Sequence, residues 1–255
     1  MEITLIKVGG AVVEDKATLN TLLDDFAAMN GSKILVHGGG RAADKILNRL
    51  GVEIKKIDGR RITDQDTIDV VTMVYAGLVN KNIIAQLQKR NVNALGFTGA
   101  DLNIILSHKR PVKTIDYGFV GDVESVHTDV LLSLIRQGAV PVVSPITHDG
   151  KGQLLNTNAD TIASELSRAL AKTCDVTLVY CFEKPGVLMD ANDDTSVIET
   201  LTYDKFKEYQ ACGIINEGMI PKLDNGFDAI RMGVKSVVIT NTDGLKNNGG
   251  TRLTL

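Results

Sequence analysis

Short apolar runs alternate with longer amphipathic stretches along all 255 residues of the chain. The short runs are rich in Val, Ile and Leu and are mostly continuous rather than interrupted by polar residues, which is typical of strands buried on both faces of a parallel sheet. They occupy residues 3–8, 33–37, 92–97, 139–143, 176–181 and 236–240. The repeated order of strand and helix predicts a doubly wound α/β fold with right-handed crossovers.

Apolar residues at helical spacing predict helices at 15–29, 41–50, 159–171 and 223–232. A longer helical stretch runs over 64–90, with Thr63 or Asp64 as its N-cap. A helix of that length carries more apolar surface than one sheet face usually covers. Two interpretations stay open at this point, a kinked core helix and a dimer contact.

Composition excludes several classes of function. The net charge is −3, with 28 basic and 31 acidic residues spread along the chain, so neither nucleic acid nor an anionic membrane surface is an expected partner. We find no window that approaches the roughly 20 apolar residues of a membrane span, and we expect a cytoplasmic protein. The histidines lack metal-ligand spacing, and the three cysteines, Cys174, Cys181 and Cys212, are expected to be buried structural thiols.

Two glycine clusters each follow a predicted strand, Lys7-Val8-Gly9-Gly10 and His37-Gly38-Gly39-Gly40. Ligands of open α/β sheets bind at the carboxyl ends of the strands. Glycines there let backbone N–H groups approach an anion, because no Cβ stands in the way. Two such loops on adjacent strands therefore predict one anion-binding rim.

A rival interpretation is a nicotinamide-dependent enzyme. Gly38 to Ala43 match a loose G-x-G-x-x-A fingerprint, and Asp58 follows about 20 residues later. This interpretation leaves Lys7 and its glycines unexplained, so we disfavour it. The chain contains neither a G-x-x-x-x-G-K-[ST] loop nor the protein-kinase signatures, so phosphoryl transfer would require another architecture.

Two polar segments stand at helix starts. Helix capping explains one or two of the polar residues in Asn156-Thr157-Asn158-Ala159-Asp160, but not all of them. In Gly218-Met219-Ile220-Pro221-Lys222, the lysine lies near the positive end of a helix dipole, where a bound anion would explain it. Lys7 is the only polar side chain of its strand between Leu5 and Val8, and the simplest structural interpretation is a lysine that reaches out to water.

These motifs together resemble the amino acid kinase family. Five segments match its pattern in the same order along essentially the whole chain, Lys7 to Gly10, His37 to Gly40, Gly59 to Thr63, Asn156 to Asp160 and Gly218 to Lys222. The resemblance implies an open αβα sandwich on a mainly parallel central sheet. It also implies an acylglutamate-binding lobe at 1–172 and a nucleotide-binding lobe at 173–255.

The resemblance also supplies residue roles. Lys7 and Lys222 would stabilise the transition state, with Asp160 orienting both. The substrate would be held by Gly39, Gly40, Arg61 and Asn156, with the planar guanidinium of Arg61 pairing with the α-carboxylate. ATP would be bound by Gly9, Gly10, Gly186, Val187, Leu188, Ile214, Ile215 and Asn216. Mg²⁺ would accompany ATP, and no side chain is assigned as a metal ligand.

The implied reaction is transfer of phosphate from ATP to the γ-carboxylate of N-acetyl-L-glutamate, an early step of arginine synthesis. A carboxylate with a pKa of about 4.3 is already ionised at neutral pH and needs no general base, which agrees with the absence of a catalytic triad. N-succinyl-L-glutamate remains an alternative substrate. Relatives in the family act on carbamate, aspartate, glutamate or UMP, but Arg61 with Asn156 favours the acylglutamate branch. A nucleotide-sensing regulator without catalysis is disfavoured because all three catalytic residues are present.

Two features depart from the family pattern. Glu183 and Pro185 stand where the family usually has an aspartate and a small residue before Gly186. Details of the nucleotide pocket, including adenine preference, depend on these positions. No helical extension precedes Ile3, which implies a homodimer without the arginine feedback of the hexameric relatives.

Overall fold

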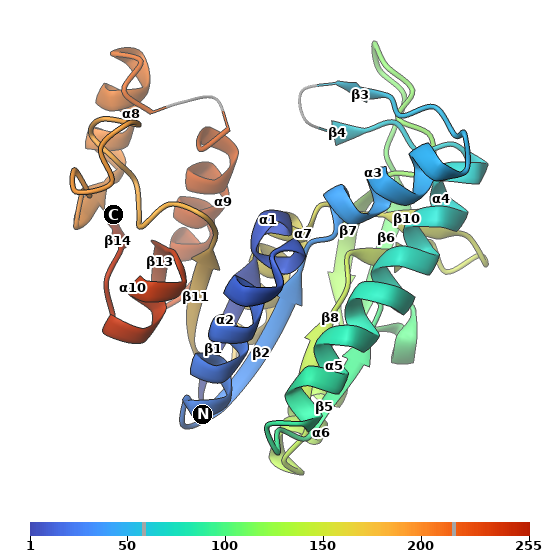
Figure 1. The fold of residues 1–255 in the computed structure, drawn as a ribbon, viewed down its shortest axis with the longest axis horizontal. Helices are drawn as coiled ribbons and strands as arrows, with labels where there is room; N and C mark the ends of the chain where they lie inside the picture. The colour runs from blue at the N-terminus through green and yellow to red at the C-terminus, as the bar shows by residue number, and fades with distance from the viewer. Residues whose placement is uncertain (58–59, 216–217) are drawn as a thin grey trace.

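The computed structural model, shown in Figure 1, describes residues 1–57, 60–215 and 218–255. Its strands are β1 (Glu2–Val8), β2 (Ser32–His37), β3 (Lys56–Ile57), β4 (Arg60–Arg61), β5 (Ala94–Phe97), β6 (Ile105–Lys109), β7 (Gly121–Val126), β8 (Val140–Val143), β9 (Ile146–His148), β10 (Leu154–Asn156), β11 (Asp175–Cys181), β12 (Thr200–Thr202), β13 (Ser236–Thr240) and β14 (Thr251–Thr254). Its helices are α1 (Gly10–Glu14), α2 (Lys16–Ala28), α3 (Gly40–Arg49), α4 (Gln65–Thr72), the π-helix η1 (Met73–Val79), α5 (Asn80–Gln88), the 3₁₀ turn η2 (Asp101–Asn103), α6 (Thr128–Arg136), α7 (Ala159–Ala171), α8 (Tyr203–Ala211), α9 (Ile220–Arg231) and α10 (Thr242–Asn247).

A central sheet runs through the whole molecule. In the described part of the chain it has eight strands in the order β12-β14-β13-β11-β1-β2-β8-β5. All neighbours in this order pair in parallel except β13 and β14, which are antiparallel. The expected α/β class with a mainly parallel central sheet is therefore confirmed. The pairing of β1 with both β2 and β11 joins the N-terminal and C-terminal parts of the chain in one sheet.

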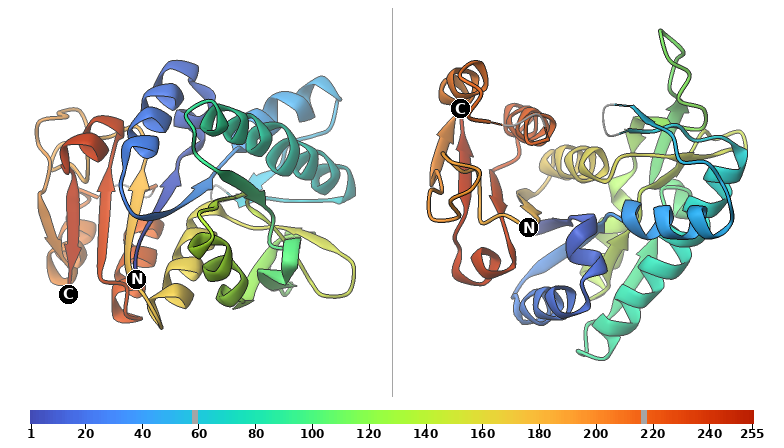
Figure 2. Two further views of the ribbon diagram at one scale, coloured as in Figure 1. Left: turned by 90° about the horizontal axis from the view of Figure 1, so that it is seen from below. Right: turned by 45° about the horizontal axis from the view of Figure 1, so that its top comes forward.

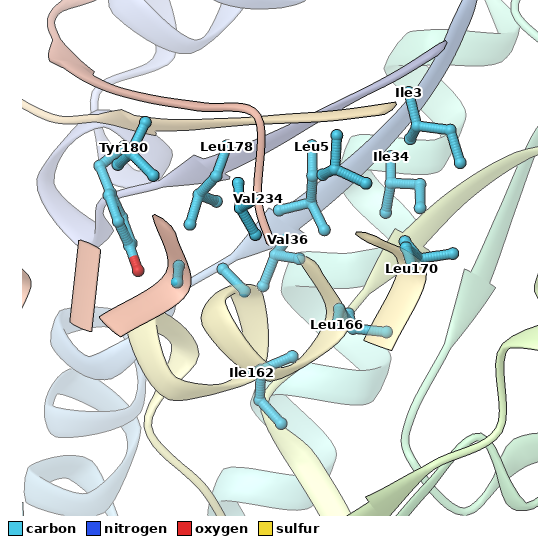
Figure 3. Packing of buried hydrophobic residues seen from close by; sticks show 14 of the residues in the cluster. Ile3, Leu5, Ile34, Val36, Ile162, Leu166, Leu170, Leu178, Tyr180 and Val234 are labelled. Carbon is cyan, nitrogen blue, oxygen red and sulfur yellow. The ribbon is translucent and has the colours of Figure 1, made fainter. Parts of the chain in front are cut away.

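Helices cover both faces of this sheet (Figure 2). One face packs against α6, α7, α8 and α9, where strand residues such as Leu5, Val36 and Leu178 meet Ile162 and Leu166 of α7 (Figure 3). The other face packs against α1 to α5, with Ile6, Leu35 and Val179 on the sheet side of that core. The central strands are therefore apolar on both faces, which explains their continuous hydrophobic runs.

The strands and helices expected from the apolar pattern are present. The six predicted strands correspond to β1, β2, β5, β8, β11 and β13, and the four shorter predicted helices to α2, α3, α7 and α9. The predicted bounds of α7 and β13 agree with the structure at both ends. The pattern does not predict a second, antiparallel-rich sheet in the order β10-β9-β6-β7, nor the short hairpin of β3 and β4.

The long helical stretch begins after Asp64, whose carboxylate accepts a hydrogen bond from the Thr67 N–H at 2.9 Å. Helix α4, η1 and α5 follow one another without a break, so the centre of the stretch is a π-helix rather than a kink. We expected no segment that could span a membrane, but this helix of 24 residues is long and apolar enough to cross one. Of its most apolar window, 44% is buried inside the protein. The same helix packs in the core through Val71 and Ile83.

The three cysteines lie in different environments, and the expectation of three buried thiols is wrong. Cys181 at the end of β11 is buried, and Cys174 is partly buried. Cys212 is exposed, because α8 buries Phe206 while its C-terminal end faces solvent.

Candidate active site

The carboxyl ends of β1, β2 and β11 bring three loops together. Val8 is in register with His37 of β2 and with Cys181 of β11, so the residues that follow these three strands leave the sheet side by side. The Gly9 N–H donates to the Cys181 carbonyl at 2.9 Å, and the Gly38 N–H donates to the Val8 carbonyl at 3.0 Å. This is the edge of an open α/β sheet at which ligands bind.

The two glycine clusters meet at this edge, as the motifs predict. A Cβ on Gly10 would lie 3.9 Å from the Gly40 nitrogen and 4.0 Å from the Gly39 nitrogen. A Cβ on Gly39 would lie 2.8 Å from the ring of Tyr75, which leaves no room for a side chain. The glycines therefore allow backbone amides from two loops to approach the same point.

Lys7, Asp160 and Lys222 lie together beside the glycines. The Lys7 ammonium is 2.7 Å from one carboxylate oxygen of Asp160, and the Lys222 ammonium is 3.6 Å from the other. The three side chains come from β1, α7 and α9, so residues more than 200 positions apart in the chain share one carboxylate. The two lysines are thereby held a short distance apart despite their like charge.

The position of Asp160 follows from how α7 begins. Asn158 is the N-cap, and its side-chain oxygen accepts hydrogen bonds from the N–H groups of Asp160 and Thr161. Burial raises the pKa of the Asp160 carboxyl, but Lys7 and Lys222 lower it more, so its pKa is held below the ordinary value. At neutral pH the site therefore contains a carboxylate between two ammonium groups.

Arg61 lies in a second cluster that borders the glycine loop. Its Nη2 donates to the Gly40 carbonyl at 3.1 Å and is 2.7 Å from the Asp44 carboxylate. Its Nη1 is buried and makes no hydrogen bond to any described residue. A buried guanidinium with an unused donor is suited to bind a carboxylate.

Asn156 is linked to the same cluster through Thr63. The Asn156 Nδ2 donates to the Thr63 hydroxyl at 3.0 Å, and that hydroxyl donates to the Arg61 carbonyl at 3.2 Å. Thr63 is fully buried, so these bonds are protected from water. These bonds connect Asn156 and Arg61 with Gly40, and Gly39, the fourth expected substrate-binding residue, precedes Gly40 in the chain.

The expected nucleotide-binding residues of the C-terminal part also lie together. A pocket with about 360 Å³ of empty space, part of it open to solvent, is lined by Lys184, Gly186, Val187, Leu188, Ala191, Ile214, Ile215 and Met219. It includes five of the six residues expected there. The sixth, Asn216, lies outside the described residues, as do Asp58 of the disfavoured nicotinamide motif and Gly59 of a family motif.

The segment that departs from the family pattern connects the pocket with the lysines. The Lys222 ammonium is 5.9 Å from the centre of the Phe182 ring, and a Cβ on Gly9 would meet the Phe182 Cβ at 3.3 Å. The next residue, Glu183, is 3.6 Å from Arg41 of α3, although both side chains are more than half exposed. This exposed pair contributes little to stability.

The sequence does not indicate the contacts that several residues make at the site. Asp44 pairs with both Arg61 and Lys56, yet it is one of many acidic residues on helices. Thr63 belongs to a motif segment but reads as a helix cap. His37 and Asn80 form a buried hydrogen bond behind the glycine loop, although they are 43 positions apart in the chain.

The family model described as "Amino acid kinase family" matches residues 2–241 of this chain. An acetylglutamate kinase of Bacteroides thetaiotaomicron is 62% identical over 252 residues, which cover 99% of this chain and 98% of that protein. An acetylglutamate kinase of Parabacteroides distasonis is 59% identical over 252 residues, with 99% of both chains covered.

A solved structure supports the same fold. The crystal structure of smu.665 from Streptococcus mutans UA159 superposes with a TM-score of 0.79 at 26% sequence identity, and the match covers 99% of this chain and 98% of that one.

Proposed function

The chain belongs to the amino acid kinase family, and from this premise we propose that it transfers the γ-phosphate of ATP to the γ-carboxylate of N-acetyl-L-glutamate. The observation that carries the proposal is the shared contact of Lys7 and Lys222 with Asp160 at the carboxyl end of the sheet. The product is N-acetyl-L-glutamyl 5-phosphate, an acyl phosphate of the arginine biosynthesis route. The enzyme is an acetylglutamate kinase, a phosphotransferase with a carboxyl acceptor.

The reaction requires charge neutralisation more than proton transfer. The attacking carboxylate is already ionised and must approach the negatively charged phosphates of ATP. Lys7 and Lys222 would reduce that repulsion and stabilise the charge on the transferring group, while Asp160 holds both ammonium groups in place. The N–H groups of Gly9 and Gly10 would contact the γ-phosphate.

The acyl substrate would lie against the second cluster. Arg61 would bind its α-carboxylate, and Asn156 would orient the substrate with Gly39 and Gly40. None of the roles proposed here assigns a residue to the acyl group, so N-succinyl-L-glutamate is the competing substrate. The fold also serves other acceptors, as a Giardia carbamate kinase with a TM-score of 0.70 at 12% identity illustrates.

ATP would occupy the pocket lined by Gly186 to Leu188 together with Ile214 and Ile215. Asn216, which lies outside the described residues, is the sixth residue proposed to bind it. Residues 1–172 would then form the acylglutamate lobe and residues 173–255 the nucleotide lobe. In the described part of the chain no group of three or more His, Cys, Asp or Glu side chains could hold a metal ion. Mg²⁺ would enter on the phosphates of its substrate ATP, which is a common mode of Mg²⁺ binding.

We also propose that the enzyme is a cytoplasmic homodimer. The long helix leaves Met73 and Leu78 exposed by 59% and 52% on its outer side, which favours the dimer contact over a helix with only a core role.

The test is to incubate the purified protein with Mg²⁺ and ATP and to measure ADP release with N-acetyl-L-glutamate and N-succinyl-L-glutamate side by side. We expect turnover of the N-acetyl substrate and much weaker turnover of the N-succinyl one. Turnover of free glutamate or UMP, with none of either acylglutamate, would contradict the assignment.

A further inference from the structure

His37 is a buried titratable residue that the proposed reaction does not use. It is the last residue of β2, has no exposed surface, and directly precedes Gly38, Gly39 and Gly40. Its Nδ1 is 2.8 Å from the carbonyl oxygen of Gly38, and its Nε2 is 3.1 Å from the side-chain Nδ2 of Asn80. Both ring nitrogens are therefore engaged by the protein.

These two contacts determine the protonation state of the ring. The Gly38 carbonyl can only accept, so Nδ1 must carry a proton and donate it. The Asn80 amide nitrogen can only donate, so Nε2 must be unprotonated and accept. The neutral Nδ1–H tautomer alone satisfies both bonds. The pKa of His37 is lowered to about 4, chiefly by burial; the bond to the Gly38 carbonyl opposes this shift, and the charge of the nearby Lys81 adds to it.

Asn80 is itself held firmly. It is buried, and its Nδ2 also donates to the carbonyl of Val142 on β8 at 3.0 Å. Its Oδ1 accepts from the Lys81 ammonium at 3.1 Å. Asn80 is the first residue after the π-helix η1, and π-helices often mark functional sites. The preceding residue, Val79, lies next to Gly39: its Cγ2 would be 3.6 Å from a Cβ at that position.

The bond from His37 fixes the orientation of one peptide group. In a trans peptide the C=O of Gly38 and the N–H of Gly39 point in opposite directions. With the carbonyl turned inward to the buried imidazole, the Gly39 N–H is turned outward. Its nitrogen lies 4.0 Å from the position of a Cβ on Gly10 and makes no hydrogen bond to a described residue.

The geometry points to His37 as a positioning residue that, held by Asn80, aims the Gly39 N–H into the gap between the two glycine loops. In the proposed reaction, this N–H faces the reacting groups, which are the carboxylate of the acceptor and the phosphoryl group of ATP. The inference rests on the proposed function for the identity of that anion. The direction of the Gly39 N–H itself follows from the hydrogen bonds of His37 and Asn80.

The first experiment compares His37→Leu with His37→Asn in the full-length protein. Leu removes the donor to Gly38, whereas the Asn side chain places an N–H donor the same number of bonds from Cα as Nδ1. We expect His37→Leu to lower kcat about 10- to 100-fold, as loss of a supporting hydrogen bond often does, with little change in KM for ATP. We expect His37→Asn to recover most of the lost kcat. A folded His37→Leu enzyme with wild-type kcat would refute the inference.

Lys33→Met is the matched control, because Lys33 is a buried polar residue at the opposite end of the same strand. Its ammonium donates to the carbonyls of Phe26, Ala27 and Met29, away from the glycine loops. This variant should lose stability while kcat and both KM values stay unchanged. If it loses as much kcat as His37→Leu at equal stability, the effect of His37 is merely structural and the inference fails.

A measurement on the wild-type protein needs neither activity nor a variant that folds. ¹⁵N NMR of the histidine ring is expected to show the neutral Nδ1–H tautomer for His37 between pH 6 and 8. An Nε2–H tautomer or a charged ring in that range would overturn the inference, whatever the substrate of the enzyme proves to be. Inactivity of the wild-type protein on acylglutamates, with the expected tautomer present, would instead count against the proposed function.

Discussion

At the scale of residues, the Asp160 carboxylate is the group on which the rest of the site depends. It is 86% buried as a side chain, since 14% of it is exposed, and it contacts an ammonium from each half of the chain. Two ammonium groups this close would repel each other without it. In the proposed reaction they keep their charge and position until the phosphates of ATP arrive, so little reorganisation is needed.

Replacing Lys222 by Ala tests this arrangement. We expect kcat to fall at least ~10²-fold at saturating substrates, because an electrostatic group that acts in the transition state is lost. Lys235→Ala is the matched control, since Lys235 also contacts two carboxylates, Glu2 at 3.1 Å and Asp175 at 2.9 Å, at the other end of the sheet. Its kcat should equal that of the wild type. Equal losses in both variants, measured by ADP release, would mean that the site lysine has no special role.

A second prediction at this scale concerns stability and pH. The pKa of His37 is about 4 in the folded protein and about 6.5 in the unfolded chain, so between these values the unfolded chain binds the extra proton. Stability is therefore fully present above pH 6.5 and is lost as the pH falls towards 4. The shift corresponds to about 3 kcal/mol of unfolding free energy from this residue.

Urea unfolding at several pH values between 7 and 4 measures the effect. The free energy of unfolding of the wild-type protein should fall by up to about 3 kcal/mol more than that of His37→Leu over this range, because the variant has no imidazole to protonate. Parallel pH curves for the two proteins would show that His37 titrates in the fold as it does in the unfolded chain.

At the scale of elements, the C-terminus of α2 is stabilised by a residue of the next strand. Lys33 of β2 donates to the carbonyls of Phe26, Ala27 and Met29 at 2.7, 3.0 and 2.8 Å, and burial lowers the pKa of Lys33. We expect Lys33→Met to lower the free energy of unfolding by about 2 kcal/mol, because buried carbonyls lose a charged donor. Chemical denaturation checks the value, and Lys16→Met at the exposed N-terminus of the same helix should leave stability nearly unchanged.

Elements with a strong apolar period could be predicted from the sequence, and those without one could not. Helix α7 carries apolar residues at helical spacing and strand β13 is a short apolar run. Both are bounded by polar residues, so their bounds were predictable. Strands β6 and β7 mix exposed and buried positions, and β9 and β10 have three residues each, too few for a period. The π-helix, two of whose residues, Tyr75 and Val79, lie against Gly39, has no local pattern in the sequence that reveals it.

The same contrast holds for the site. Lys7 and Lys222 could be predicted because a cation beside glycines, or at a helix start, conflicts with ordinary local preferences. Their common contact with Asp160 depends on the path of the sheet between them. The pairing of Asp44 with Arg61 was not predictable, since an acidic residue on an amphipathic helix is ordinary. A residue that conflicts with local preferences can thus be singled out from the sequence, whereas the residues that contact it are found only in the fold.

At the scale of the whole molecule, one sheet carries both proposed lobes. Strand β1 pairs with β2 on one side and β11 on the other, so Lys7 lies on the strand of the first lobe that borders the second (Figure 1). Arg61 and the nucleotide pocket lie on opposite sides of it. A ligand that contacts Arg61 and a ligand in that pocket would therefore meet near Lys7, where the proposed transfer occurs.

The remaining apolar surface of the long helix is explained if two copies of the chain associate. Met73 and Leu78 are exposed by 59% and 52%, and burying them against a second copy would be favourable by the hydrophobic effect. We expect Leu78→Glu to convert the dimer into a monomer in sedimentation velocity experiments, because a charge cannot be buried unpaired at such a contact. Met232→Glu at the end of α9, where the side chain is 55% exposed, is the matched control and should remain dimeric. If Leu78→Glu stays dimeric or the wild type is a monomer, the long helix is not the contact, and its outer face must have another explanation.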